Sequence, residues 1–114
     1  MEARWRDWGA RLRGLAQSGL YYGPEAGAAD MARVREIGDA LLDGAADWDP
    51  DRQRGWGAEL RRISDLTLAD GPRDLYDLNR CLSLREIGED MEEDIPLRAW
   101  AEWELRAQTR RKSR

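Results

Sequence analysis

The residues with the most evident chemical potential are six acids between positions 86 and 94, a segment that holds no basic residue. Glu86, Glu89 and Asp90 share one face of a helix, because residues three and four apart project from the same side. Carboxylate oxygens are the ligands that Mg²⁺ prefers, and a bound Mg²⁺ can polarise a diphosphate for hydrolysis. The spacing therefore supports a metal-site hypothesis, in which these three residues hold the ion.

A second acidic helix would have to complete such a site, and Glu36 and Asp39 are the candidates for it. Clusters of Glu and Asp on facing helices hold the metal in all-α nucleotide pyrophosphatases of the MazG type, which gives the hypothesis a reaction class. The simpler interpretation is a solvated helix end. Acids there oppose the helix dipole, and the basic C-terminal tail is a candidate to compensate them.

Composition excludes several other kinds of chemistry. The chain has no His, so it lacks the commonest general base and the imidazole metal ligands. The lone Cys81 can form neither an intrachain disulfide nor a cysteine-based zinc site, and we expect it to pack as a small apolar group. The net charge of -4 argues against a nucleic-acid groove, although the basic tail, 109–114, could touch nucleic acid or an acidic partner.

Hydropathy points away from membranes. No apolar run is long enough to span a bilayer, and the N-terminal residues lack the continuous apolar core of a signal peptide. We therefore expect a soluble cytoplasmic protein without a membrane partner.

The elements that must position these residues repeat along the chain. Trp8–Arg13 returns as Trp56–Arg61, 48 positions later, and Arg35–Gly38 returns as Arg85–Gly88, 50 positions later. Matches in the same order indicate a tandem duplication, with repeat unit one at 3–43 and repeat unit two at 51–93.

Apolar residues at spacings of three and four predict helices in both units, and no segment alternates as a strand would. The predicted helices cover residues 3–18, 29–43, a segment that starts at Asp49–Pro50, about 73–93, and 96–108. The first is expected to end at Ser18–Gly19, since Gly accepts the left-handed conformation at a helix C-terminus. The prediction is a single all-α domain, 1–114, of about five helices.

The apolar spacing within the fourth predicted helix, about 73–93, gives a more detailed expectation. Leu75, Leu78 and Leu82, followed by Ile87 and Met91, are expected to line the fourth helix, with a kink.

Gly38 and Gly88 lie inside helical patterns, where Gly costs about 1 kcal/mol against Ala. Close packing explains such a residue, either of two helices or of an indole on bare backbone. Our hypothesis is that Trp8 covers Gly38 and Trp56 covers Gly88.

The first unit resembles the helical N-terminal region that precedes the catalytic domain in a group of Nudix hydrolases. The resemblance lies in the tryptophan-bearing segment 5–16, the turn Gln17–Tyr22 and the second helix with Arg35–Ile37, although the loop 23–27 departs from the usual composition. In that family the region helps to dimerise the enzyme and shape substrate access. The resemblance implies a non-catalytic interaction module, apparently duplicated in 51–93.

A catalytic Nudix box can also be counted from Gly71, with Asp77 in the place of the first glutamate and Arg85–Asp90 in the place of its core. The pattern lacks the closing glycine, no strands are predicted to carry it, and duplication already accounts for the core. The alternative to an interaction module is thus a Mg²⁺-dependent nucleotide or diphosphate hydrolase.

The function that we favour is self-association or binding of a protein partner, with no cofactor. Tyr21 and Tyr22 lie beside a Gly-rich turn, and Trp100 and Trp103 are three apart on a short fifth helix that cannot hide both. These four aromatic residues are the predicted interface of a homodimer or of a complex with another protein.

Overall fold

A computed structural model describes the backbone of residues 1–22 and 28–112 and the side chains of residues 1–19 and 29–111. The helices are α1 (Glu2–Tyr22), α2 (Ala28–Asp43), a 3-10 turn η2 (Ala45–Asp47), α3 (Pro50–Asp70), α4 (Leu75–Glu93) and α5 (Leu97–Lys112). These residues include five α-helices and no strand, so the predicted all-α fold is confirmed.

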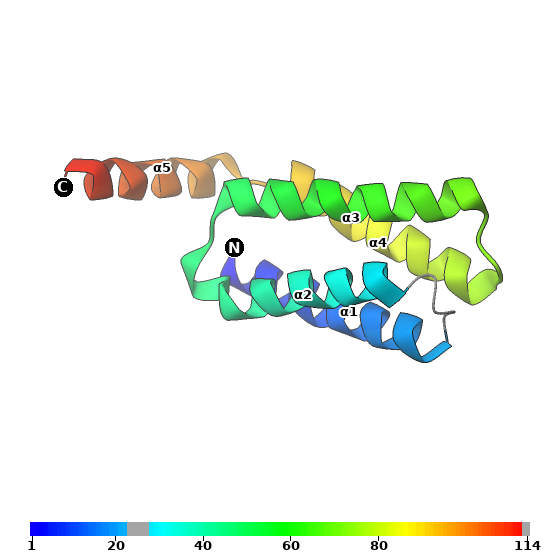
Figure 1. Ribbon diagram of the computed structural model, residues 1–114. Coiled ribbons are helices and arrows are strands. Elements are labelled where there is room, and N and C mark those ends of the chain that lie inside the picture. Colours follow the sequence, from blue (N-terminus) through cyan, green and yellow to red (C-terminus); the bar gives the residue numbers. More distant parts are fainter. Residues whose placement is uncertain (23–27, 113–114) are drawn as a thin grey trace.

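The first four helices form two antiparallel hairpins, α1 with α2 and α3 with α4, that lie against each other (Figure 1). The hairpins coincide with the two predicted repeat units. α5 extends beyond one end of this four-helix bundle, which makes the molecule elongated, with extents of 52 × 22 × 21 Å.

The start of α3 follows directly from its sequence. The Asp49 side chain accepts hydrogen bonds from the backbone N–H groups of Asp51, at 2.9 Å, and Arg52, at 3.3 Å. Pro50 occupies the first helical position, where no N–H donor is needed. The other end of α3 stops at Gly71, whose φ of +93° is a conformation that L side chains rarely adopt. The Asp49–Pro50 prediction is confirmed.

Two helix ends differ from the prediction. α1 does not stop at Ser18–Gly19 but continues to Tyr22. Gly19 is buried, and a Cβ atom placed on it would collide with the side chain of Met31. This glycine therefore allows α1 and α2 to pack closely instead of ending a helix. α5 runs to Lys112, past the predicted end at 108, because its basic residues are compatible with a helix.

The core runs between the hairpins, and all four of their helices contribute to it. Its fully buried apolar members, each at most 2% exposed, include Trp5, Trp8, Leu12, Val34, Ile37, Leu41, Leu60, Leu84, Ile87 and Met91. Trp5 of the first hairpin meets Trp56 of the second edge to face, with ring centroids 5.5 Å apart. Such a contact between two indoles stabilises the fold beyond the effect of burying their apolar area.

The predicted stripe of α4 is only half correct. Ile87 and Met91 are buried, but Leu75 is 73% exposed and Leu82 is 47% exposed. Residues seven apart lie on nearly the same side of a helix, so Leu75 and Leu82 share a face that is turned away from Ile87 and Met91. The apolar residues change faces along α4.

Within each hairpin, paired glycines let the two helices approach closely. A Cβ atom placed on Gly9 would lie 2.8 Å from the carbonyl oxygen of Gly38, and one placed on Gly38 would lie 2.9 Å from that of Gly9. In the second hairpin, Gly57 and Gly88 approach in the same way, at 2.7 Å in both directions. The helices of each hairpin therefore cross backbone against backbone.

This geometry corrects the indole hypothesis. The atoms nearest to the missing Cβ of Gly38 belong to Gly9, Leu12 and Arg13, not to Trp8. The equivalent neighbours of Gly88 come from residues 57, 60 and 61, not from Trp56. The glycines are required by helix packing, the other explanation that the sequence allowed.

Candidate interaction surface

α5 is joined to the bundle at its first turns. It begins after Pro96, whose carbonyl accepts a hydrogen bond from the N–H of Trp100 at 3.1 Å. The guanidinium of Arg54, in α3, lies over the ring of Trp100 at 4.7 Å from its centroid. An ion pair between Arg98 and Glu102, 3.4 Å apart, supports the helix along its exposed side. Beyond this anchor α5 extends away from α3 and α4 (Figure 1).

The outer face of α5 is apolar and open to solvent. Leu97, Ala101 and Leu105 follow one another at spacings of four, which places them along one side of the helix. Leu97 is 84% exposed and Leu105 is 64% exposed. We call Leu97, Ala101 and Leu105 the outer stripe of α5.

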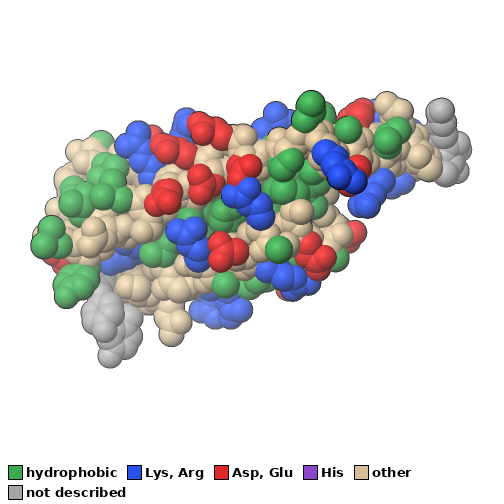
Figure 2. All heavy atoms as spheres, turned by 180° about the vertical axis from the view of Figure 1, so that it is seen from behind, with side chains coloured by type: hydrophobic (Ala, Val, Ile, Leu, Met, Phe, Trp, Pro, Cys, Tyr) green, Lys and Arg blue, Asp and Glu red, His purple; other side chains and the backbone are tan. Residues whose placement is uncertain are grey.

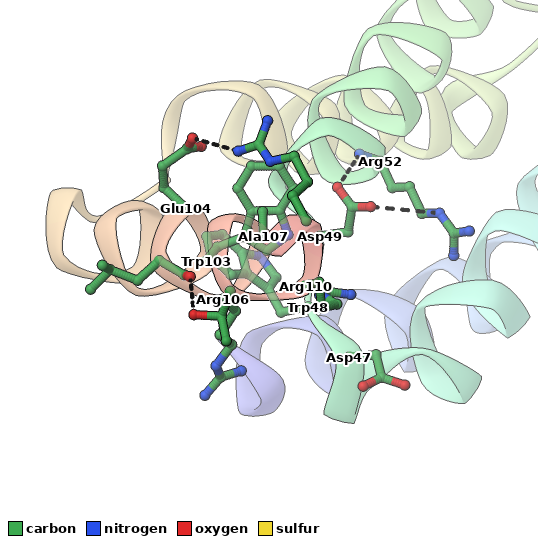
Figure 3. Close-up of a pocket in the computed structure, with 12 residues that line it drawn as sticks. Asp47, Trp48, Asp49, Arg52, Trp103, Glu104, Arg106, Ala107 and Arg110 are labelled. Carbon is green, nitrogen blue, oxygen red and sulfur yellow. Dashed lines mark hydrogen bonds and ion pairs between the residues drawn. The ribbon is translucent and has the colours of Figure 1, made fainter. Parts of the chain in front are cut away.

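The side of α5 turned toward the bundle forms one wall of a groove, with η2 and the start of α3 as the other (Figure 3), and Leu105 of the outer stripe also lines it. Trp48 and Trp103 both line it, and Arg106 of α5 and Asp47 of η2 bring opposite charges to its walls. The lining residues are Asp47, Trp48, Asp49, Arg52, Trp103, Glu104, Leu105, Arg106, Ala107, Thr109, Arg110 and Arg111. The groove is open, so it suits a surface contact better than an enclosed small molecule.

The four predicted interface residues do not form one surface. Trp100 and Trp103 are both half-buried in α5, with ring centroids 5.6 Å apart. Tyr21 and Tyr22 belong to the last turn of α1, and their side chains lie outside the described residues. That turn is at the end of the bundle away from α5 (Figure 1). Trp100 and Trp103 therefore mark the α5 surface, and the two tyrosines do not belong to it.

The acids of α4 interact individually with their surroundings. Glu89 accepts a hydrogen bond from Arg85 at 3.2 Å, Glu86 is exposed and Asp90 is half-buried. Asp77, which the Nudix-box count places at the first glutamate, accepts a hydrogen bond from the N–H of Arg73 at 3.1 Å near the start of α4. These contacts give Glu89 and Asp77 structural roles.

The two acids of α2 that the metal-site hypothesis requires are each paired with a different arginine. Glu36 forms an ion pair with Arg33 at 3.1 Å, and Asp39 forms one with Arg13 at 3.1 Å. Within the part of the chain that the structure describes, no three His, Cys, Asp or Glu side chains are grouped so as to hold a metal ion. The two-helix carboxylate cluster that the hydrolase hypothesis requires is thus not assembled among these residues.

Cys81 is buried in the second hairpin at 4% exposure. Burial raises the pKa of its thiol, so the reactive thiolate is disfavoured. As expected from the sequence, this residue contributes packing.

Four further large apolar side chains are exposed that the sequence did not predict to be so. They are Leu66 of α3 and Leu75, Tyr76 and Leu82 of α4, with exposed fractions between 47% and 80%. Seen from behind, green apolar side chains gather at the bundle end away from α5 and again along α5 itself (Figure 2). The sequence does contain a signal for this exposure. Leu75 and Leu82 are seven residues apart and lie on a different helix face from Ile87 and Met91.

Comparisons of the chain with protein-family models, curated proteins and solved structures found no match. Among residues 1–22 and 28–112, no helix combines the length and the apolar character that crossing a membrane requires.

Proposed function

We propose that this chain is a non-catalytic helical module that acts by self-association, with α5 as its docking element. The observation that carries the proposal is the outer stripe of α5, in which Leu97 and Leu105 stand 84% and 64% exposed on a helix that leaves the bundle. Fully burying a leucine side chain contributes roughly 1.5–3 kcal/mol, so covering both leucines would favour association substantially. The resemblance to the Nudix N-terminal region, which helps to form enzyme dimers, agrees with this role.

Trp100 and Trp103 add to the case. Tryptophan is favoured at protein interfaces because a large apolar ring carries a polar N–H group. Both are half-buried on one flank of α5, and Trp103 also lines the groove, so a partner that covers the outer stripe and reaches the edge of the groove gains apolar ring surface as well.

Sedimentation of the purified chain over a wide range of concentrations tests the proposal. We expect the mass to rise from that of the 13.1 kDa monomer toward twice that value. Replacing both stripe leucines, Leu97→Glu with Leu105→Glu, should abolish the rise, because a buried unpaired charge is costly.

The matched control is Leu75→Glu with Leu82→Glu, which places the same charges on the exposed leucines of α4. It should leave association unchanged, and circular dichroism should show all three proteins equally helical. A wild-type chain that stays monomeric at every concentration would rule the proposal out.

A further inference from the structure

The outer stripe of α5 is symmetric about its centre. Leu97 and Leu105 each lie four residues from Ala101. When two copies of α5 pack face to face around Ala101, leucine meets leucine and the two small alanines meet at the middle. The distance between two packed helices depends on the side chains at the contact, so alanine at the centre allows a close approach. A second copy of α5 therefore fits this surface without any other partner.

Parallel and antiparallel pairing would both pack leucine against leucine, so the charges along α5 decide between the two arrangements. The last part of α5, residues 106–112, contains four basic residues and no acid, a charge of +4. A parallel pair would place the two +4 segments side by side. An antiparallel pair centred on Ala101 places residue 105 of one copy level with residue 97 of the other. The basic segment 106–112 of each copy then extends past the start of the other α5, toward residues 90–96 that precede it.

The segment that the antiparallel pair offers to each basic end is of the opposite sign. Residues 90–96 contain Asp90, Glu92, Glu93 and Asp94 and no base, a charge of -4 over the same length of seven residues. Glu93 is exposed at the end of α4, where α5 leaves the bundle (Figure 1). Within one chain, Asp94 already pairs with Arg4, and Glu92 pairs with Arg61 at 2.8 Å. The basic end of α5 points away from this segment (Figure 1), so Asp90 and Glu93 are the acids left for the basic end of a second copy.

A second pair of charges fits the same arrangement. Arg98 flanks the outer stripe with a side chain that is 90% exposed, and Glu102 flanks it on the same side. In an antiparallel pair the same flanks of the two helices meet, which brings Arg98 of each copy within reach of Glu102 of the other. In a parallel pair opposite flanks meet, and this contact is lost.

We propose that α5 pairs antiparallel with the α5 of a second copy, centred on Ala101, with the basic end of each copy on the acidic segment 90–96 of the other. The inference rests on the proposed self-association and adds its geometry. The two bundles then lie at opposite ends of the paired helices.

Disulfide crosslinking tests the geometry on the full-length chain, in a Cys81→Ala background that removes the only native thiol. Leu97→Cys is mixed with a mass-tagged Leu105→Cys chain, and the two are oxidised and separated without reductant. The antiparallel pair predicts the mixed disulfide, because positions 97 and 105 of the two copies face each other. It predicts no disulfide between two Leu97→Cys chains, whose thiols are about 12 Å apart along the helix at 1.5 Å per residue.

The possible outcomes distinguish the antiparallel geometry from the proposed self-association on which it rests. A disulfide between two Leu97→Cys chains would establish parallel pairing and overturn the inference, while self-association would stand. A doubled mass by sedimentation without the mixed disulfide would have the same meaning. If the wild-type mass never rises above 13.1 kDa, both the inference and the proposed function fail.

Ionic strength gives an independent measurement. Contacts between exposed opposite charges are screened by salt, so the dissociation constant of the antiparallel dimer should rise about tenfold or more between low and high salt. Parallel pairing predicts the reverse, because salt would relieve the repulsion between the two basic ends. Tighter association in high salt, seen together with the Leu97→Cys disulfide, would overturn the antiparallel arrangement.

Discussion

The two hairpins of the bundle are alike inside and different where they meet. Gly9 faces Gly38 within the first, and Gly57 faces Gly88 within the second, at nearly the same distances. Each hairpin thus keeps the same crossing of its two helices. Divergence is visible instead at the interface between the hairpins, where one side chain must fit another from the opposite unit.

Position 5 and its repeat equivalent, position 53, show this divergence. Trp5 is buried in the first hairpin, whereas the second hairpin has Gln53, also buried. The indole N–H of Trp5 donates to the side-chain oxygen of Gln53 at 2.8 Å, and the N–H of Trp48 donates to the same oxygen at 2.8 Å. The amide nitrogen of Gln53 donates to the carbonyl of Met91 at 2.9 Å. The two repeat-equivalent positions thus hold different side chains, and these side chains bind each other.

The glycine crossings should give the largest effect when they are disturbed. Gly88→Ala brings a methyl group to 2.7 Å from the carbonyl oxygen of Gly57, and backbone cannot rotate away as a side chain can. We expect a loss of roughly 3 kcal/mol in the free energy of unfolding, the upper end of the usual cost of about 1–3 kcal/mol for overpacking. Gly38→Ala should cost a similar amount if the two hairpins are equivalent. Denaturant titration followed by circular dichroism measures both.

Gly14 and Gly55 are the matched controls, since a Cβ atom on either would meet nothing within 4 Å. Both lie in helices, so Gly14→Ala and Gly55→Ala should raise stability by up to about 1 kcal/mol through helix propensity alone. The comparison breaks down if Gly38→Ala is tolerated while Gly88→Ala is not, because the first hairpin would then be free to widen.

Gln53 should give the next largest effect. Gln53→Leu keeps much of the volume but leaves the indole N–H groups of Trp5 and Trp48 and the carbonyl of Met91 without this partner. A buried polar group that loses its partner costs about 1–3 kcal/mol, so we expect a loss of roughly 2 kcal/mol or more on thermal unfolding.

Adding Trp5→Phe to Gln53→Leu removes one of the stranded donors and should recover part of that loss. If the two changes were simply additive, the hydrogen bond would not couple the hairpins.

The helices were predictable from the sequence because their signals are local. The cap at Asp49–Pro50 and the three- and four-residue spacing of apolar residues in α1, α2 and α3 depend on neighbours a few residues away. The exposure of Leu75 and Leu82 depends instead on which face of α4 the other hairpin covers. The glycine contacts were anticipated as close packing, but the partner of Gly38 could be identified only once the helix crossing was known.

The candidate surface was predictable in part for the same reason. Trp100 and Trp103 were identified because a short helix cannot hide two indoles three residues apart. The prominence of Leu97 and Leu105 follows from the direction in which α5 leaves the bundle, which the sequence of α5 does not encode.

A smaller effect is expected from an ion pair that links the hairpins. Arg33 of α2 donates to both carboxylate oxygens of Glu59 of α3, at 2.6 and 3.0 Å. By the repeat, the equivalent positions hold Ser83 and Arg11, which cannot form this pair. The hydrogen bond from Arg33 lowers the pKa of Glu59, so the folded state favours the ionised carboxylate.

The sign of that shift fixes the pH dependence. A carboxyl whose pKa is lower in the folded state stabilises the fold above its unfolded pKa, near 4.3, and loses this contribution as the pH falls through the folded value. Glu59→Gln should therefore cost about 0.5–1 kcal/mol at neutral pH, a modest value because the pair is partly exposed, and almost nothing in strong acid. Urea titrations of both proteins from pH 7 downward measure the difference.

Glu36→Gln is the control, since Glu36 also binds Arg33 but is more exposed, and its difference should be smaller throughout. A Glu59→Gln difference that stayed constant into acid would mean that the side chain stabilises the fold by packing, not by its charge.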